Sequence, residues 1–233
     1  MQGNHSLENL EERIGYKFHN LALLKQALTH SSFTNEQKIN KFHDYERLEF
    51  LGDAVLELVS SEFLYKLYPD VPEGELTKKR ASMVCEPSLA FCARDLELGQ
   101  FMLLGRGEEV TGGRDRDSIT SDAMEAVIGA IYLDGGMEPA KAFIDRFILS
   151  DLEDKQLFYD SKSNLQELIQ GKLKKDFNYE LLEESGPEHN KTFRVSVFME
   201  NECLGTGTGR TKKAAEQQAA YKALLLLRDK KCI

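Results

Sequence analysis

A run of carboxylates between residues 44 and 68 has the spacing that could present several oxygen ligands on one side of a helix. The acids follow one another at intervals of three, four and four residues, which places them on one helix face; they are Glu46, Glu49, Asp53 and Glu57. Like charges at these intervals repel each other, and Arg47 is the basic residue nearest to them in the sequence. The exposed face of an ordinary amphipathic helix could have the same spacing, so the run alone leaves both interpretations open.

A second pair of carboxylates favours a metal site. Asp122 and Glu125 lie three residues apart near the start of a segment, 118–133, that is apolar nearly all round. A helix of that kind is expected to be buried, and a buried carboxylate is costly unless it is paired or bound to a metal. The helix dipole could account for Asp122, but Glu125 lies a turn deeper. Two helices that each supply two acids can converge on a set of oxygen ligands, which Mg²⁺ prefers.

The elements that must position these acids are helices. Apolar residues recur at helical spacing, with stop signals at glycine and proline, and they predict helices over residues 6–13, 21–28, 44–68, 76–85, 87–98, 118–133 and 138–149. Polar or glycine-rich segments predict loops over residues 33–43, 72–74 and 104–117. No segment before residue 150 alternates as a strand does, so residues 1–150 are predicted to form an all-α domain.

The pattern changes after an acidic stretch, residues 151–160, which we interpret as a linker. The elements predicted beyond it are a helix over 162–175, strands over 179–184, 192–199 and 203–209, and a final helix over 212–229. A hairpin turn is expected at Asn201 and Glu202. The order α-β-β-β-α predicts a small α+β domain over residues 161–230, so the fold class is an α-dominated protein of two domains.

Charge is distributed unevenly between the two parts. The whole chain has a formal net charge of −9, which by itself argues against a nucleic-acid partner because phosphate binding requires lysine and arginine. Residues 1–159 contain 17 Lys and Arg against 28 Asp and Glu, whereas residues 160–233 contain 13 against 11. The second part is therefore slightly basic, which supports the two-domain organisation.

The cysteines and the apolar segments indicate a cytoplasmic protein. The four cysteines form no C-x-x-C pair, which argues against zinc and against a disulfide framework. Cys85 and Cys92 lie in an apolar stretch, and we interpret them as one face of a buried helix in a reducing compartment. No apolar run approaches the ~18–20 residues needed to span a bilayer, and the first residues lack the apolar core of a signal peptide.

Four motifs in the chain resemble the ribonuclease III family. They have the family's order and spacing: ALTHSS at 27–32, ERLEFLGDAVL at 46–56, PEGELTKKRASMV at 72–84 and SDAMEAVIGAIYLD at 121–134. The resemblance implies a homodimeric endoribonuclease that uses Mg²⁺, for which Mn²⁺ can substitute, and that needs no small-molecule cofactor and no membrane. The implied substrates are double-stranded RNAs, such as precursor rRNA and structured transcripts. The implied products carry 5′-phosphate and 3′-hydroxyl ends with short 3′ overhangs.

The resemblance also implies roles for individual acids. The catalytic carboxylates are expected to be Glu49, Asp53, Asp122 and Glu125. Three of these would bind the metal directly, namely Glu49, Asp122 and Glu125, whereas Asp53 would orient metal-bound water or the metal's coordination shell. Glu46 and Glu73 match acids of the dimer and RNA-cleft region, and a supporting role is expected for both.

The C-terminal part resembles the double-stranded RNA-binding domain, and three groups of contacts are implied. The first helix would lie in one minor groove with Ser163, Gln166, Glu167 and Gln170. His189, between the first two strands, would reach the next minor groove. The phosphates in between would be bound at the start of the last helix by Arg210, Lys212 and Lys213. Such a domain recognises the A-form shape more than the sequence, although each residue taken alone could be an ordinary exposed polar residue.

Two other classes of function are compatible with parts of this pattern. The first is a non-catalytic double-stranded RNA-binding dimer, but the presence of all four carboxylates argues against it. The second is a metal-dependent phosphohydrolase of small substrates, and the C-terminal domain argues against that. The sequence therefore favours a magnesium-dependent endoribonuclease.

Overall fold

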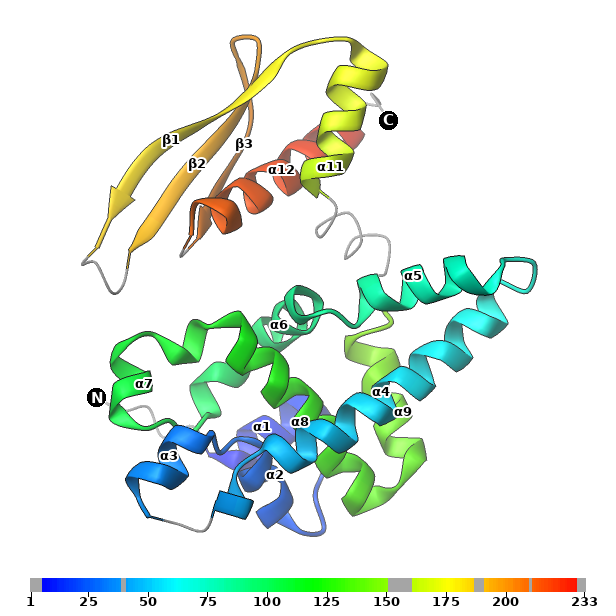
Figure 1. The fold of residues 1–233 in the computed structure, drawn as a ribbon, viewed down its shortest axis with the longest axis vertical. Coiled ribbons are helices and arrows are strands. Elements are labelled where there is room, and N and C mark those ends of the chain that lie inside the picture. Colours follow the sequence, from blue (N-terminus) through cyan, green and yellow to red (C-terminus); the bar gives the residue numbers. More distant parts are fainter. Residues whose placement is uncertain (1–5, 39–40, 151–160, 187–190, 210, 230–233) are drawn as a thin grey trace. The chain divides into compact units, whose positions relative to one another are not determined.

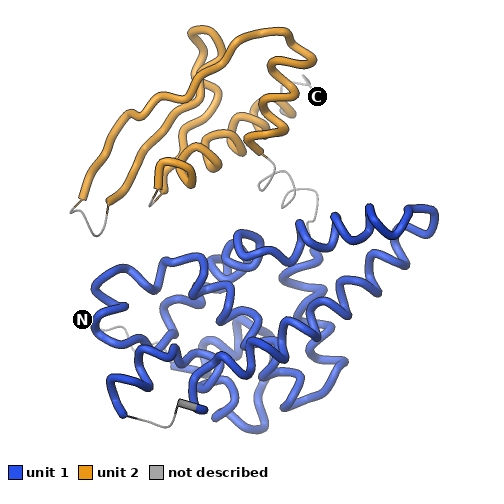
Figure 2. Tube along the Cα trace, viewed as in Figure 1, with its two compact units in different colours: residues 1–152 blue, residues 153–233 orange. Residues whose placement is uncertain are grey.

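The structure is a computed structural model that describes residues 6–38, 41–150, 161–186, 191–209 and 211–229. The chain forms two compact units, Met1–Leu152 and Glu153–Ile233 (Figure 2). Each unit has its own cluster of buried apolar side chains. The segment 151–160, which we interpret as a linker, lies outside the described residues, as do His189 and Arg210.

The first unit is helical throughout its described part (Figure 1). Its α-helices are α1 (Leu7–Ile14), α2 (Leu21–Ala27), α3 (Ser31–Glu36), α4 (Glu46–Leu67), α5 (Glu73–Met83), α6 (Glu86–Asp95), α7 (Arg106–Val110), α8 (Asp117–Gly135) and α9 (Met137–Phe147). Short 3₁₀ turns lie at Lys41–His43, Leu98–Phe101 and Gly113–Asp115. The prediction of an all-α fold for this part of the chain is confirmed.

Two of the predicted loops contain short helices. Helix α3 extends into the segment 33–43 and begins before it at residue 31, where the side chain of His30 accepts a hydrogen bond from the backbone of Ser32. Helix α7 lies within 104–117, where the side chain of Glu36 accepts from the backbone N–H of Arg106 at 2.7 Å. Both helices are short and they contact each other through Glu36 and Arg106, which are 70 residues apart, and periodicity does not detect such a contact.

Two further predictions at helix starts were wrong. Residues 72–74 are not a separate turn, because Pro72 caps α5 and Glu73 is its first residue. An acid in the first turn of a helix is favoured by the helix dipole. Cys85 and Cys92 do not share a helix face, since Cys85 precedes α6 and is partly buried, whereas Cys92 lies within α6 and is buried.

Helix α8 forms the centre of the first unit. Most of its residues from Ile119 to Ile131 are buried, and it packs against α2, α4, α6 and α9 (Figure 1). Helix α4 makes the most extensive of these contacts. The nearly uniform apolar character of α8 thus reflects a helix that is covered on all sides.

Two glycines set the distance between α4 and α8. A Cβ on Gly52 would lie 1.8 Å from the carbonyl oxygen of Glu125, and one on Gly129 would lie 2.2 Å from the carbonyl oxygen of Leu48. Backbone meets backbone at both places, so no side chain fits between the helices. This close crossing is the reason that acids on α4 can reach acids on α8.

A buried carboxylate ties the end of α8 to the loop before α2. Asp134, whose side chain is 2% exposed, accepts hydrogen bonds from the hydroxyl of Tyr16 at 2.7 Å and from the backbone N–H groups of His19 and Asn20 at 2.8 Å. Burial alone would raise the pKa of Asp134, but these hydrogen bonds hold it below its usual value. The contact stabilises the fold as long as Asp134 is ionised.

Replacing this carboxylate should make the protein less stable at neutral pH. Asp134→Asn replaces one of the two acceptor oxygens with an amide N–H₂ that faces one or two of these donors, so we expect a loss of roughly 1–3 kcal/mol in the free energy of unfolding. A lowered pKa contributes stability that is present above the unfolded-state value of 3.8 and is lost as the pH falls further. Denaturant unfolding at pH 7 and pH 3.5 checks both points, because the difference between variant and wild type should shrink at the lower pH. An equal difference at both would contradict the assignment.

The second unit is a three-stranded antiparallel sheet with helices at both ends of the sequence. Its elements are α11 (Ser161–Gln166), a π-helical continuation (Glu167–Leu173), β1 (Phe177–Ser185), β2 (Thr192–Met199), β3 (Glu202–Gly209) and α12 (Lys212–Asp229). The strand order is β1-β2-β3, with Tyr179 opposite Val197 and Val195 opposite Gly207. Helix α12 packs on β2 and β3 and lies beside α11 (Figure 1).

The predicted order α-β-β-β-α is confirmed, and β2 and α12 have the predicted bounds. The hairpin turn is displaced by one residue from its predicted place. Glu202 already pairs with Met199 in the sheet, and Glu200 has the positive φ of 56° that closes the turn. The turn therefore consists of Glu200 and Asn201.

Candidate metal centre and RNA-binding surface

Three of the predicted acids meet where α4 crosses α8. Glu49 comes from α4, and Asp122 and Glu125 come from α8; one carboxylate oxygen of each lies within 4.8 Å of the others. All three side chains are partly buried. The glycine contacts at Gly52 and Gly129 hold the two helices close enough for this convergence. The three residues are those that the sequence analysis expected as direct metal ligands.

The other acids of the carboxylate stripe on α4, which consists of Glu46, Glu49, Asp53 and Glu57, lie around these three residues. Asp53 is exposed, yet it is near enough for its charge to raise the pKa of Glu125. Glu46 is exposed in the first turn of α4, and its charge raises the pKa of Glu49. Glu57 lies further along the helix, 4.0 Å from Arg80. The stripe therefore contributes one residue to the close group and two residues to its surroundings.

The electrostatics of the close group suit a divalent cation. Burial, followed by the charges of Asp53, Glu49 and Asp122, raises the pKa of Glu125 to about 8. Burial, followed by Asp122 and other nearby acids, raises the pKa of Glu49 to about 7. Burial also raises the pKa of Asp122. A set of crowded carboxylate oxygens is the donor set of a hard ion such as Mg²⁺, and the ion would relieve the repulsion between them.

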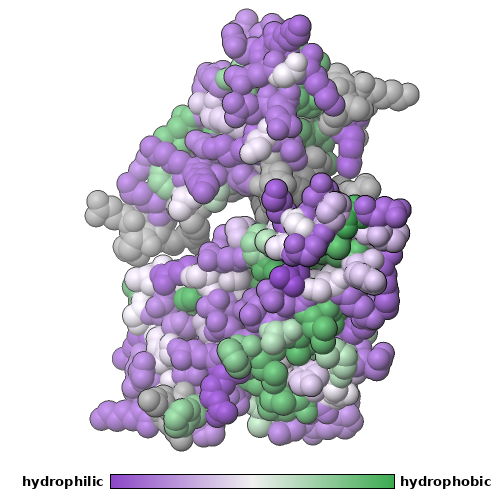
Figure 3. Space-filling view, turned by 45° about the vertical axis from the view of Figure 1, so that its right-hand side comes forward, coloured by the Kyte–Doolittle hydropathy of each residue, from purple (hydrophilic) through white to green (hydrophobic). Residues whose placement is uncertain are grey.

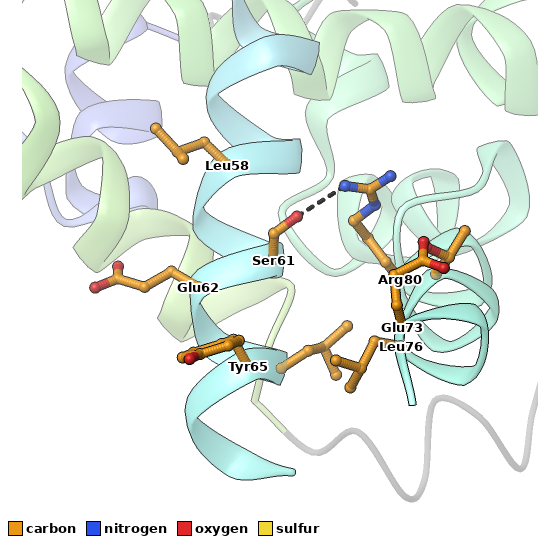
Figure 4. A pocket seen from close by; sticks show the side chains of 9 residues that line it. Leu58, Ser61, Glu62, Tyr65, Glu73, Leu76 and Arg80 are labelled. Atoms are coloured by element: carbon orange, nitrogen blue, oxygen red, sulfur yellow. Dashed lines mark hydrogen bonds between the residues drawn. The ribbon is translucent and has the colours of Figure 1, made fainter. Parts of the chain in front are cut away.

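Glu73 lies in a groove between α4 and α5. The groove has a volume of about 480 Å³ and is lined by Leu58, Ser61, Glu62, Leu64, Tyr65, Glu73, Leu76, Thr77 and Arg80 (Figure 4). Arg80 donates to the hydroxyl of Ser61 at 2.8 Å, and the hydroxyl of Thr77 donates to Glu73 at 2.9 Å. None of the three close acids lines this groove. Within one chain, Glu73 is therefore separate from the candidate metal centre.

The residues predicted to bind RNA are exposed wherever the structure describes them. Ser163, Gln166, Glu167 and Gln170 are exposed on α11 and its continuation, where the amides of Gln166 and Gln170 share a hydrogen bond of 3.1 Å. Lys212 and Lys213 are exposed in the first turn of α12. The ammonium of Lys212 lies 5.8 Å from the ring centroid of Phe193. The structure thus leaves both groups accessible to a ligand.

Tyr45 was not predicted as a site residue, and its hydroxyl donates to Oδ2 of Asp122 at 3.4 Å. Its position four residues before Glu49 was the available signal, since that interval places both residues on one face of a helix. Gly52 and Gly129 were missed as well. A glycine within a helical pattern indicates a close approach only when the neighbouring helix is known.

Comparison with known proteins gives matches over both units. The family model described as Ribonuclease-III-like matches residues 20–152, and that described as Double-stranded RNA binding motif matches residues 161–227. Ribonuclease 3 of Caldanaerobacter subterraneus subsp. tengcongensis is 52% identical over 221 residues, covering 94% of this chain and 96% of that protein. Ribonuclease 3 of Shouchella clausii is 50% identical over 225 residues, covering 96% and 86%.

A solved structure matches the first part of the chain. It is the nuclease domain of ribonuclease III from Campylobacter jejuni, 47% identical, with a TM-score of 0.58, and the match covers 61% of this chain and 96% of that one. That structure is described for its flexibility in a region involved in dimer formation.

A helical domain that gathers carboxylates from two helices, together with a domain of the kind that binds duplex RNA, defines a divalent-metal-dependent nuclease of double-stranded RNA. The chain belongs to the ribonuclease III family. It is a double-strand-specific endoribonuclease, as its sequence motifs indicate.

Proposed function

We propose that this endoribonuclease cleaves RNA duplexes with Mg²⁺ held by Glu49, Asp122 and Glu125, and that Mn²⁺ can take the place of Mg²⁺. The observation that carries the proposal is the approach of three carboxylate oxygens from two helices to within 4.8 Å of one another. Burial, followed by repulsion from the neighbouring acids, raises the pKa values of Glu49 and Glu125, and a divalent cation would offset both effects. Precursor rRNA and structured transcripts are the proposed substrates.

The roles of the side chains follow from their positions. A bound Mg²⁺ supplies a water of lowered pKa and neutralises negative charge on the scissile phosphate. Glu49, Asp122 and Glu125 would hold the ion at the helix crossing. Asp53, exposed beside them, would orient the attacking water and accept its proton. Attack by water with loss of the 3′ oxygen gives a 5′-phosphate and a 3′-hydroxyl.

We further propose that two chains act together as a homodimer. Several large apolar side chains of α4 are exposed, namely Phe50 at 81%, Leu58 at 58%, Tyr65 at 75% and Leu67 at 50%. Figure 3 shows hydrophobic side chains gathered on one face of the first unit. Patches of this kind mark protein interfaces, and Glu73 in the neighbouring groove would then belong to the interface region. Sedimentation of the full chain should give twice the mass of one chain, and a monomer would contradict the proposal.

In the same proposal, residues 1–150 carry catalysis and dimerisation, and residues 161–230 bind the duplex. Residues 161–230 would contact RNA in two minor grooves and at the phosphates between them. His189 and Arg210 would contribute to these contacts together with the exposed residues of α11 and α12. Among the described residues, no helix is both long and apolar enough to cross a membrane. The proposed location is the cytoplasm, where the RNA substrates are made and processed.

The proposed chemistry is tested by incubating the protein with a long RNA duplex in Mg²⁺, in Mn²⁺ and in EDTA. Short duplexes with 5′-phosphates and 3′-hydroxyls should appear with either metal and be absent in EDTA. Treatment of the products with phosphatase and then with kinase reads the 5′ end. Products with 5′-hydroxyls, or cleavage in EDTA, would overturn the mechanism. Binding without cleavage under every condition would favour the non-catalytic double-stranded RNA-binding dimer.

Removing the second unit should separate binding from catalysis. We expect a chain that ends after residue 152 to bind duplex RNA more weakly, because it loses the phosphate contacts at the start of α12. Its cleavage should also become more sensitive to salt, yet some activity should remain at low salt. The separate apolar core of the first unit supports folding of this fragment on its own. Cleavage at 20 and 200 mM salt is the measurement, and a folded but inactive fragment at low salt would contradict the division of roles.

A further inference from the structure

Tyr45 is a buried residue at the metal centre for which the catalytic assignments give no role. It directly precedes α4 and is 3% exposed. Its hydroxyl donates a hydrogen bond over 3.4 Å to Oδ2 of Asp122, which lies on α8. The side chain of Tyr45, at the start of α4, thus contacts a proposed metal ligand on α8.

The backbone of Tyr45 is held on both sides. Its N–H donates to the carbonyl oxygen of Thr29 at 2.9 Å. Its carbonyl oxygen accepts from the N–H groups of Leu48 and Glu49 at 2.8 and 2.9 Å. Tyr45 therefore connects the ALTHSS motif at 27–32 with the turn of α4 that carries Glu49.

The same motif holds the ring of Tyr45. The ring of His30 packs against it, with centroids 5.6 Å apart and planes at 59°. Nδ1 of His30 accepts from the N–H of Ser32 at 3.1 Å, and the hydroxyl of Ser32 accepts from the N–H of Gly105 at 2.9 Å. These hydrogen bonds fix the imidazole, which in turn limits the orientation of the phenol.

The hydroxyl of Tyr45 acts as a hydrogen-bond donor. It lies beside a carboxylate oxygen of Asp122, and of these two groups the phenol is the one that carries an O–H to donate. An ionised carboxylate can only accept. The separation of 3.4 Å is longer than a usual O–H···O bond.

We propose that Tyr45, held by the 27–32 motif, is a positioning residue that orients the carboxylate of Asp122 toward the cation bound with Glu49 and Glu125. The phenol contacts Oδ2 of Asp122, and Oδ1 would remain available to a cation. Hydrogen-bond partners of metal ligands typically alter metal affinity by about 10–100-fold when they are removed. The inference rests on the metal centre proposed above, and it gives the ALTHSS motif a function.

The test compares three variants of the full chain by their affinity for Mn²⁺ without RNA, measured as free Mn²⁺ by electron paramagnetic resonance. Tyr45→Phe keeps the ring and removes the hydroxyl. Tyr16→Phe is the matched control, since it removes a hydroxyl that donates to another carboxylate of α8, Asp134. Asp134 lies roughly 18 Å along the helix from Asp122 by the helical rise. Glu125→Gln removes a proposed ligand itself.

We expect Tyr45→Phe to weaken Mn²⁺ binding about 10-fold and Tyr16→Phe to leave it unchanged. The Mg²⁺ concentration for half-maximal cleavage should rise about 10-fold in Tyr45→Phe, with the rate recovering at saturating Mg²⁺. Thermal unfolding without metal checks that its fold is intact. Wild-type Mn²⁺ affinity in Tyr45→Phe, with weakened binding in Glu125→Gln, would overturn the positioning role alone. Unchanged affinity in both variants would overturn the metal centre as well.

Discussion

Glu125→Gln is expected to abolish cleavage of duplex RNA while leaving RNA binding nearly unchanged. The substitution keeps the size of a side chain at the helix crossing but removes one of three converging carboxylates. The residues expected to bind RNA lie on the second unit and are untouched. Cleavage of a labelled duplex and its binding in Ca²⁺ or EDTA are the two measurements. Cleavage at the wild-type rate would show that Glu125 is not part of the metal site.

The same variant should be more stable than the wild type when metal is absent. In the folded wild type the pKa of Glu125 is raised from 4.5 to about 8, so between these values the folded state holds more protons than the unfolded state. Stability therefore falls as the pH rises through this range. Glutamine has no charge to lose, and we expect a gain of about 1–2 kcal/mol at pH 8, because solvent screens part of the repulsion.

Unfolding in EDTA at pH 5 and pH 8 tests this second effect, since the advantage of the variant should grow with pH. Glu57→Gln is the matched control, because Glu57 lies on the same stripe of α4 but beside Arg80. This control should cleave normally and show no such gain. A Glu125→Gln variant that is less stable than the wild type at pH 8 would contradict the electrostatic account.

Gly52→Ala is expected to cause the largest loss of stability. The added methyl group would lie 1.8 Å from the carbonyl oxygen of Glu125, and the neighbouring atoms are backbone, so the helices must separate. Overpacking of this kind costs about 3 kcal/mol. The separation also moves Glu49 away from Asp122 and Glu125, so Mn²⁺ binding should be lost even in the fraction that folds.

Gly74→Ala is the matched control for this substitution. Gly74 lies in α5, and a Cβ there would meet no atom within 4 Å. Alanine is favoured over glycine in helices by roughly 1 kcal/mol, so this variant should be at least as stable as the wild type. Thermal unfolding of both variants is the measurement. A Gly52→Ala protein that unfolds at the wild-type temperature would show that the crossing tolerates a wider separation.

The parts of the fold that could be predicted are those with a strong local pattern. The long apolar stripes of α4 and α8, the alternation in β2 and the alanines of α12 indicated their elements to within about two residues. Helices α3 and α7 were missed because they are short and contact each other across 70 residues of sequence, with Glu36 of α3 accepting from the backbone at the start of α7. The hairpin turn was displaced because pairing between strands, rather than turn composition, decided its place.

The residues of the candidate site could be predicted from the sequence, but the geometry that brings them together could not. Helical spacing placed the acids on two faces, and the family motifs selected among them; the roles of individual acids stay predictions. The helix crossing at Gly52 and Gly129 cannot be predicted from one sequence. The need for glycine at these positions is apparent only when the backbone of the opposite helix is known. Tyr45 was overlooked because its contact with Asp122 joins positions 77 residues apart.

The contact between the backbones of α4 and α8 also bears on which ions the enzyme can use. Side chains at a helix interface can rearrange to let a site widen, but two abutting main chains have little room to do so. Oxygens lie 2.0–2.1 Å from magnesium and about 2.3–2.6 Å from calcium. We therefore expect the fixed helix separation to select cations by ionic radius. Small divalent cations should bind, and calcium should bind poorly even when it is abundant.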